Sequence, residues 1–181
     1  GKTGSNGDAV QQEEELYSMV VFSKGSEYFN WTYAGFSDAA KAMGAHIKTE
    51  LVGPAEVDAA AEAKALEQLI AKKPNGIVVT SADSNTLIPS INKAISADIP
   101  VVGFDVASPE SNYLGFVGTD NYSFGCVAAD IAAELTGGTG EVAVLYVPGN
   151  VDLEKRLNGF KDTCAEKYPN LKVVAELKPR G

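Results

Sequence analysis

The sequence predicts an α/β fold built on a parallel β-sheet. Short apolar segments alternate with longer segments whose apolar residues recur every three or four positions, from Leu16 to Leu177. This alternation of strands and helices requires parallel strand pairing with right-handed crossover connections. Several of the strands run directly into clusters of small polar residues. Such clusters are typical of the strand ends at which open α/β sheets bind their ligands.

The first part of the chain contains five expected strands. They are residues 17–23, 45–52, 77–80, 100–104 and 113–117. The segments between the first four strands carry apolar residues at helical spacing, as helices packed on a sheet do. The first of these helices ends at Gly44. Its expected buried face is the stripe Phe29, Tyr33, Phe36, Ala40 and Met43.

The second part repeats the pattern on a smaller scale. After the segment Gly-Thr-Asp-Asn at 118–121, a helix runs to about Leu135, and strands at 141–147 and 171–177 enclose another helix at 153–168. The expected apolar stripe of the earlier helix is Phe124, Val127, Ile131 and Leu135. Two strands and two helices make a poor domain alone. We therefore expect this part either to pack on the first part or to be a fragment of a larger lobe.

These patterns divide the chain into a flexible leader at 1–15, an α/β lobe at 16–119 and a partial second lobe at 120–181. The leader has hardly an apolar side chain and cannot bury enough surface to fold. Its opening Gly-Lys-Thr lacks the strand, the earlier glycine and the helix of a phosphate-binding loop. A leader of this kind suits the lipid-anchored tether of a bacterial lipoprotein, although a tag-cleavage scar also leaves an N-terminal glycine.

Composition excludes several classes of partner. The formal net charge of −9 and the pI near 4.6 argue against nucleic acid, which requires a basic face. No apolar run has the length of a membrane span, so a membrane is expected as a partner only through an N-terminal lipid anchor. Cys126 and Cys164 have no metal-binding spacing. A buried Cys164 and a separate, half-exposed Cys126 are favoured over a disulfide between them.

The sequence shows no catalytic constellation. His46 is the one histidine, and it stands at the start of an expected strand, away from the carboxyl ends of the strands. The motifs of nucleophilic hydrolases, zinc proteases and dinucleotide-binding folds are missing. We therefore expect no enzyme activity, no catalytic or metal-ligating residue and no cofactor.

Candidate ligand-binding residues follow the strands at 77–80 and 100–104. Asp105 comes directly after an apolar strand, where its carboxylate can accept hydrogen bonds from hydroxyl groups of a ligand. The alternative role for Asp105 is to cap a turn before Ser108-Pro109. Thr80 and Asp83 follow the earlier strand, and each either contacts ligand or caps the next helix. Capping is the stronger alternative for Asp83.

Three aromatic residues lie after the first strand, at the start of the first helix. Tyr28, Phe29 and Trp31 can offer flat faces to a ring-shaped ligand. Phe29 also begins the apolar stripe of the helix, so a purely structural role in the core is an equal alternative for it. Tyr28 and Trp31 lie off the stripe and are the better candidates.

Four segments together resemble the periplasmic sugar-binding proteins of ABC importers, of the ribose- and galactose-binding type. They are SKGSEYFNWTYAGFSDAAKAMG, IPVVGFD, VGTDNYSFG and LEKRLNGFK. The resemblance covers residues 16 to about 177 and implies the Rossmann-like type I periplasmic-binding-protein fold, here as one complete lobe plus part of a second. In that family two lobes close over the sugar. The effector lobes of lac-repressor-type regulators share the fold.

The resemblance assigns roles to individual residues. Tyr28 and Phe29 match the aromatic pair that sandwiches the sugar ring, and Asp105 matches the aspartate that binds sugar hydroxyls. Ser26 and Thr80 stand at positions where an asparagine often binds hydroxyls. The segment at 118–121 corresponds to the first crossing between the lobes.

Two departures from the family pattern change the expected ligand. Val106 stands where the ribose type has an arginine, and Glu154 replaces a second sugar-contacting arginine, although Arg156 matches a neighbouring one. The loss of two guanidinium groups would remove forked clamps on hydroxyls. We therefore expect a different sugar, a polyol or another small hydroxylated solute rather than ribose, with Glu154 among the ligand-binding residues.

The resemblance implies an extracytoplasmic solute-binding protein that captures a sugar-like molecule and delivers it to an ABC permease. The last third of such a receptor is missing, which predicts a truncated chain. A ligand-sensing ectodomain, or the effector-binding lobe of a regulator, is an alternative with the same fold, although the acidic leader disfavours a DNA-binding repressor. A flavodoxin-like enzyme or flavin carrier is a second alternative, for which the segment KGSEYFN is weakly suited.

Overall fold

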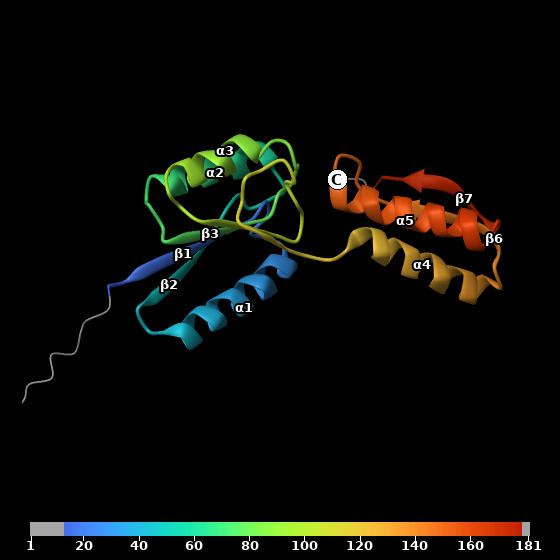
Figure 1. Cartoon of the computed structure of the whole chain (residues 1–181), viewed down its shortest axis with the longest axis horizontal. Coiled ribbons are helices and arrows are strands. Elements are labelled where there is room, and N and C mark those ends of the chain that lie inside the picture. Colours follow the sequence, from blue (N-terminus) through green and yellow to red (C-terminus); the bar gives the residue numbers. More distant parts are fainter. Residues whose placement is uncertain (1–12, 179–181) are drawn as a thin grey trace, which may run out of the picture.

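The computed structural model describes residues 13–178 and confirms the α/β fold with parallel sheets (Figure 1). Five strands form one parallel sheet in the order β2-β1-β3-β4-β5, and β6 and β7 form a second. We call the five-stranded sheet with α1, α2 and α3 the first lobe, and the two-stranded sheet with α4 and α5 the second lobe. The exact sequence limits of these lobes as independent domains stay a prediction.

The first lobe alternates strands and helices along the chain. Its elements are β1 (Glu15–Val20), α1 (Glu27–Met43), β2 (Ile47–Val52), α2 (Ala59–Ile70), β3 (Gly76–Val79), α3 (Ile88–Ser96), β4 (Val101–Phe104) and β5 (Phe116–Val117). Helix α1 lies on one face of the sheet, and α2 and α3 lie on the other (Figure 1). The main core lies under α2 and α3, where Leu66, Leu69 and Ile91 pack on Val20, Val79 and the other apolar residues of the central strands.

Because these strands are parallel, their carboxyl ends share one edge of the sheet. Val20 pairs with both Val52 and Val79, and Val79 pairs with Gly103. This edge faces the second lobe (Figure 1). The loops that follow β1, β3 and β4 therefore come together at the junction of the two lobes.

The second lobe consists of α4 (Asn121–Thr136), β6 (Thr139–Leu145), α5 (Val151–Lys167) and β7 (Asn170–Leu177). Residues 118–120 link β5 to α4 and cross from one lobe to the other (Figure 1). Helices α4 and α5 touch at two glycines. A Cβ atom on Gly125 would lie 2.0 Å from the carbonyl oxygen of Arg156, and one on Gly159 would lie 2.1 Å from that of Tyr122. Only glycine permits this close approach of the two backbones.

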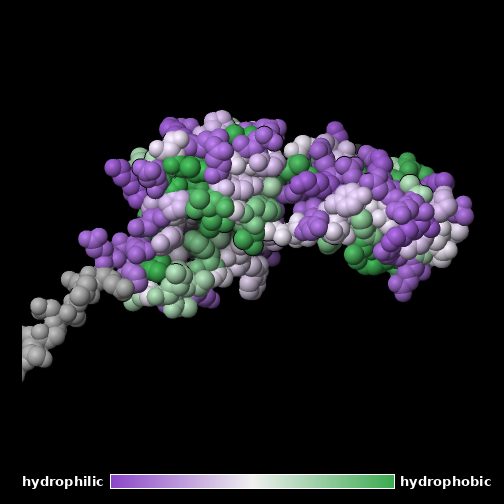
Figure 2. All heavy atoms as spheres, viewed as in Figure 1, coloured by the Kyte–Doolittle hydropathy of each residue, from purple (hydrophilic) through white to green (hydrophobic). Residues whose placement is uncertain are grey.

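The close helix contact makes the expected apolar stripe of α4 wrong. The buried residues of α4 are small or polar, and they are Asn121, Gly125, Ala129 and Ala133. The four large residues of the predicted stripe, Phe124, Val127, Ile131 and Leu135, are instead exposed. Hydrophobic residues are visible over α4 at the surface of the second lobe (Figure 2). The small residues face inward because they are the ones that allow α5 to approach.

Smaller corrections concern the limits of elements. Residues 113–115 precede β5 rather than form its start, so the strand expected at 113–117 is only two residues long. Met43 is exposed at the end of α1 and does not contribute to its buried face. Glu15 already belongs to β1, and residues 1–12 of the expected leader lie outside the described residues.

The cysteines follow the expectation. Cys164 is buried, Cys126 is partly exposed, and both are free thiols. Between residues 13 and 178, no helix has the length and apolar character to cross a membrane.

Candidate binding cleft between the lobes

A cleft of about 540 Å³ lies where the two lobes meet. It is lined by Phe22, Ser26, Tyr28, Phe29, Asp105, Val106, Thr119, Asn121, Asn150, Asp152, Leu153 and Arg156. One wall therefore comes from the loops after β1 and β4, and the other from the starts of α4 and α5. This is the place at which the strand ends of an open α/β sheet are expected to bind a ligand.

The central pair of the first-lobe wall is Tyr28 and Asp105. The Tyr28 hydroxyl donates a hydrogen bond of 2.9 Å to Oδ1 of Asp105. Burial, followed by this hydrogen bond to the carboxylate, raises the pKa of Tyr28 to about 12, so the phenol stays protonated. The Tyr28 ring also meets the Phe29 ring edge to face, with 5.2 Å between centroids. Together they present a phenol, an aromatic edge and a carboxylate to the cleft.

The backbone of Asp105 holds a left-handed conformation, with φ of 60°. Aspartate tolerates this region better than most residues. Burial raises the pKa of Asp105, whereas the hydrogen bonds from Tyr28 and Thr80 lower it in part. A partly desolvated carboxylate of this kind is a strong hydrogen-bond acceptor for hydroxyl groups.

The second-lobe wall is organised by Arg156 and Asn121. Both Nε and Nη2 of Arg156 donate to Oδ1 of Asn121, with 3.1 Å from Nε. The guanidinium carbon lies 4.3 Å from the centroid of the Phe124 ring, which is a cation–π contact. Arg156 therefore keeps a fixed orientation at the cleft, with donors left for a ligand because a guanidinium has five.

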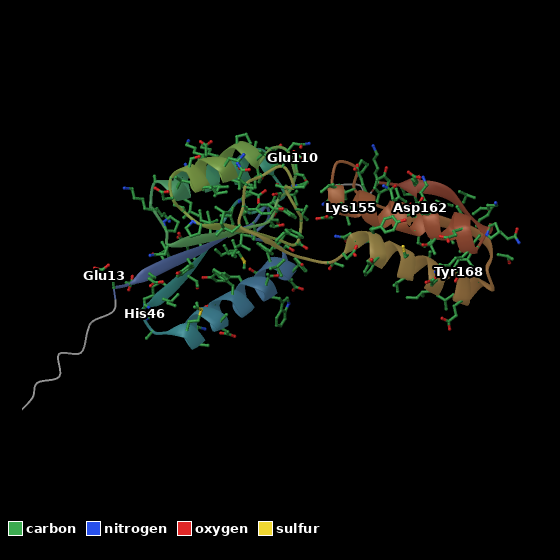
Figure 3. The ribbon with its side chains drawn as sticks, viewed as in Figure 1. Glu13, His46, Glu110, Lys155, Asp162 and Tyr168 are labelled. Atoms are coloured by element: carbon green, nitrogen blue, oxygen red, sulfur yellow. The ribbon has the colours of Figure 1, made fainter. Side chains whose placement is uncertain are left out.

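The start of α5 supplies the remaining polar groups. The side chain of Asn150 caps the helix by accepting from the amides of Asp152 and Leu153, at 3.1 Å each. Asp152 is buried, and its Oδ2 accepts from the Ala107 amide in the first lobe at 2.8 Å. Its other oxygen lies 3.8 Å from Nζ of Lys155. Figure 3 shows Lys155 at the end of α5 that faces the first lobe.

Four of the eight predicted ligand-binding residues line this cleft. They are Ser26, Tyr28, Phe29 and Asp105. Phe29 is also a core residue, since it is almost fully buried and its ring packs edge to face on Phe22 and Phe104. The core role considered for Phe29 is therefore confirmed, and its contact with a ligand stays a prediction.

The structure does not bring Trp31, Thr80, Asp83 and Glu154 to the lining of the cleft. Trp31 points outward from α1 and is 78% exposed. Thr80 is completely buried behind Asp105, where its hydroxyl faces Asp105 and accepts from the Val106 amide at 3.3 Å. Thr80 therefore contacts Asp105 and the Val106 amide from inside the first lobe and does not face the cleft.

Asp83 and Glu154 accept hydrogen bonds from residues close to them in the sequence. Asp83 accepts from the amides of Asn85 and Thr86 and from the Thr86 hydroxyl, which lowers its pKa. These bonds lie in the turn before α3, whose N-cap residue is Leu87 without a side-chain cap, so Asp83 does not cap the helix as the alternative expected. Glu154, in the first turn of α5, accepts from the Gly149 amide of the preceding loop at 2.9 Å. Arg156, which matches a neighbouring arginine of the family, lines the cleft two residues after Glu154.

Sequence reasoning missed the second-lobe wall. Asn121, Asn150, Asp152 and Arg156 lie at the starts of helices, and polar residues there are read first as caps. Arg156 matches an arginine of the family but was not placed among the ligand-binding residues. A further signal for it is its position three residues before Gly159, on the helix face that packs on α4.

No group of metal-ligating side chains gathers anywhere in residues 13–178. His46 lies at the edge of the first lobe far from the second lobe (Figure 3), 3.9 Å from a carboxylate oxygen of Glu15. The cleft thus combines carboxylates, amides, hydroxyls and one guanidinium with aromatic and aliphatic surface. This combination can bind a small hydroxylated molecule through hydrogen bonds on both sides.

Comparisons with known proteins identify the family and the fold. Residues 17–180 match the sequence profile of the periplasmic binding protein domain. The chain is 27% identical over 178 residues to a xylitol-binding protein of Mycolicibacterium smegmatis, covering 97% of this chain and 48% of that relative. The chain therefore spans about half the length of the curated relatives it matches.

Two solved structures are similar at higher identity. A sugar-binding protein of a sugar ABC transporter from Bacillus halodurans is 40% identical, with a TM-score of 0.84 over 92% of this chain and 57% of that one. AraP, an arabinose-binding protein from Geobacillus stearothermophilus, is 38% identical, with a TM-score of 0.80 over 91% of this chain and 56% of that one.

Proposed function

The chain belongs to the periplasmic binding protein family, and we propose that it captures a neutral sugar or polyol in the cleft between its lobes. The observation that carries this proposal is the position of Asp105. Its carboxylate is held by Tyr28 on one wall of a cleft whose other wall carries Arg156 and Asn121. Acceptors and donors on opposite walls match the hydroxyl groups of a polyhydroxylated solute, which both donate and accept.

The charges of the cleft support an uncharged ligand. Two carboxylates, Asp105 and Asp152, line it, and Arg156 is the one cationic side chain among the described lining residues. Two donors of that guanidinium are already directed at Asn121. An anionic ligand, such as a sugar phosphate, would bring further negative charge to two carboxylates in a partly desolvated site, which is unfavourable.

We further propose that the protein works outside the cytoplasm as the receptor of an ABC importer. The relatives described as sugar-binding or sugar-transporter proteins support this role. The lipid anchor expected from the leader belongs to the same proposal. The ligand would be bound between the lobes and presented with them to a permease.

A thermal-shift screen tests the proposed ligand class. The panel contains xylitol, D-ribose, D-allose and D-arabinose, with D-ribose 5-phosphate and D-glucuronate as charged controls. At least one neutral member should raise the melting temperature in proportion to the logarithm of its concentration, because a ligand that binds only the folded state stabilises it. Shifts confined to the charged members, or the absence of any shift at millimolar concentration, would contradict the proposal.

A further inference from the structure

The loop that carries Asp105 is fixed mainly by the first lobe. The Asp105 amide donates to the carbonyl oxygen of Val117 at 3.0 Å. The next amide, that of Val106, donates to the Thr80 hydroxyl at 3.3 Å. The Ser84 hydroxyl donates to the Ala107 carbonyl oxygen at 2.7 Å. Buried backbone groups are almost always paired in this way.

One group of this loop is paired by the second lobe instead. The Ala107 amide is buried, and its acceptor is Oδ2 of Asp152, 45 residues further along the chain. Within residues 13–178, this is the one hydrogen bond that joins the two lobes, apart from those of the 118–120 linker. If the lobes separate, the Ala107 amide loses its partner.

Asp152 is held in position to accept this hydrogen bond. It is only 6% exposed, and it occupies the first turn of α5, where the helix dipole stabilises negative charge. The Asn150 cap fixes the turn from which the side chain projects. Lys155 lies 3.8 Å from its second oxygen. The carboxylate is thus held in place by its own helix before it meets the first lobe.

We infer that Asp152 is a positioning residue that couples the arrangement of the lobes to the orientation of Asp105. The coupling runs through Ala107, two residues after Asp105, and the amides of Asp105 and Val106 just before it are bonded to the first lobe. The inference rests on the proposed function, because it assigns to Asp152 a role in forming that site. In the lobe arrangement of this structure, the Ala107 amide is protected and the Asp105 loop is held from both sides.

Amide hydrogen exchange in the ligand-free protein tests this inference directly. Asp152→Ala should accelerate exchange of the Ala107 amide about tenfold or more, since a buried amide loses its acceptor. The Val106 amide, bound to Thr80, should stay protected and report that the loop is still folded. Asp152→Asn retains a side-chain oxygen at the same place and should restore slow exchange. Asp162→Ala, which removes an exposed carboxylate of α5 that accepts from Tyr122, is the matched control.

Binding of the sugar found in the screen supplies the second readout. Asp152→Ala should raise its Kd about tenfold, and Asp152→Asn should recover most of this loss. If the Ala107 amide exchanges equally in the wild-type protein and Asp152→Ala, with the core amides of Leu66 and Val79 protected in both, the inference is overturned. If Asp152→Ala accelerates exchange but no sugar binds the wild-type protein, the inter-lobe contact stands and the proposed function fails.

Discussion

The hydroxyl of Tyr28 donates to the carboxylate of Asp105 over 2.9 Å, although 77 residues separate them in the chain. Tyr28 opens α1, and Asp105 follows β4, so the contact exists only because β1 and β4 end at the same edge of the sheet. The pair places an aromatic face next to a partly buried acceptor. It is the feature of the first lobe on which our account of ligand binding depends.

Tyr28→Phe should weaken ligand binding by about three- to tenfold, because Asp105 loses a hydrogen bond that orients it while the ring is retained. The same change should raise the pKa of Asp105, since the hydrogen bond from Tyr28 lowers that pKa. The pH below which binding is lost should therefore move upward. Calorimetric titrations between pH 4 and 8, together with an NMR titration of the Asp105 carboxyl carbon, measure both effects. A binding profile identical to that of the wild-type protein would show that the contact is irrelevant to the site.

Arg156 and Asn121 should be energetically coupled. Arg156→Lys removes the planar fork that reaches Oδ1 of Asn121, and a lysine cannot reproduce it. We expect each of Arg156→Lys and Asn121→Ala to reduce the free energy of unfolding by about 1–2 kcal/mol. The double variant should lose about 1 kcal/mol less free energy of unfolding than the sum of the losses of the two single variants.

Urea denaturation of the wild-type protein, the two single variants and the double variant measures this double-mutant cycle. Strict additivity would mean that the hydrogen bonds contribute nothing to stability. Lys172→Ala, on an exposed position of β7, controls for the loss of a long cationic side chain.

Glu62 should make the protein less stable as the pH rises. It is completely buried in α2, one oxygen accepts from the Ala82 amide, and the other has no partner among the described residues. Burial raises its pKa to about 8. The folded protein then holds a proton that the unfolded chain releases above about pH 4.5, so the free energy of unfolding decreases between pH 5 and pH 8. The loss from this group is about 3 kcal/mol.

Glu62→Gln should remove this part of the pH dependence and stabilise the protein at pH 8. Denaturation curves at pH 5, 6.5 and 8 measure it, with Glu67→Gln on the exposed side of the same helix as the control. If the free energy of unfolding falls equally between pH 5 and pH 8 in the wild-type protein and in Glu62→Gln, Glu62 is ionised over this whole range and the expectation is wrong.

Gly125→Ala should destabilise the second lobe. The added methyl group would meet the backbone of α5, which cannot move without displacing Arg156. We expect a loss of about 1–3 kcal/mol, the usual cost of overpacking. Gly35→Ala, in α1 with open space around it, is the matched control and should stabilise by about 0.5–1 kcal/mol. Equal effects of the two substitutions, measured by thermal unfolding, would contradict the proposed helix contact.

The first lobe could be predicted from the sequence because its elements follow simple periodicities. The strands are short and apolar, Gly44 ends α1 where expected, and the parallel pairing of the strands follows from their alternation with helices. Asp105 lines the cleft and was singled out because a charged residue directly after an apolar strand stands where such sheets bind ligands. Tyr28 was found because it lies off the apolar stripe of its helix.

The second lobe was harder to predict because α4 buries its small residues against α5 and exposes its large apolar ones. Periodicity assigns the large apolar residues of α4 to the core, yet Gly125 and Ala129 face α5. Asp152 and Arg156 were missed because their partners, Ala107 and Asn121, are distant in sequence. A hydrogen bond between residues 35 or 45 positions apart leaves no periodic trace in a single sequence.

The central claim is that Asp105 binds a neutral polyhydroxylated ligand in the cleft. Isothermal titration of the wild-type protein and Asp105→Asn, with the sugar that gives the largest thermal shift, tests it most directly. Asparagine tolerates the left-handed backbone at this position, so the variant should melt within about 2 °C of the wild-type protein. We predict one-to-one binding to the wild-type protein and an affinity at least about a hundredfold lower for Asp105→Asn, since charge-assisted hydrogen bonds contribute about 1.5–3 kcal/mol each. Equal affinities of the two proteins would contradict the account.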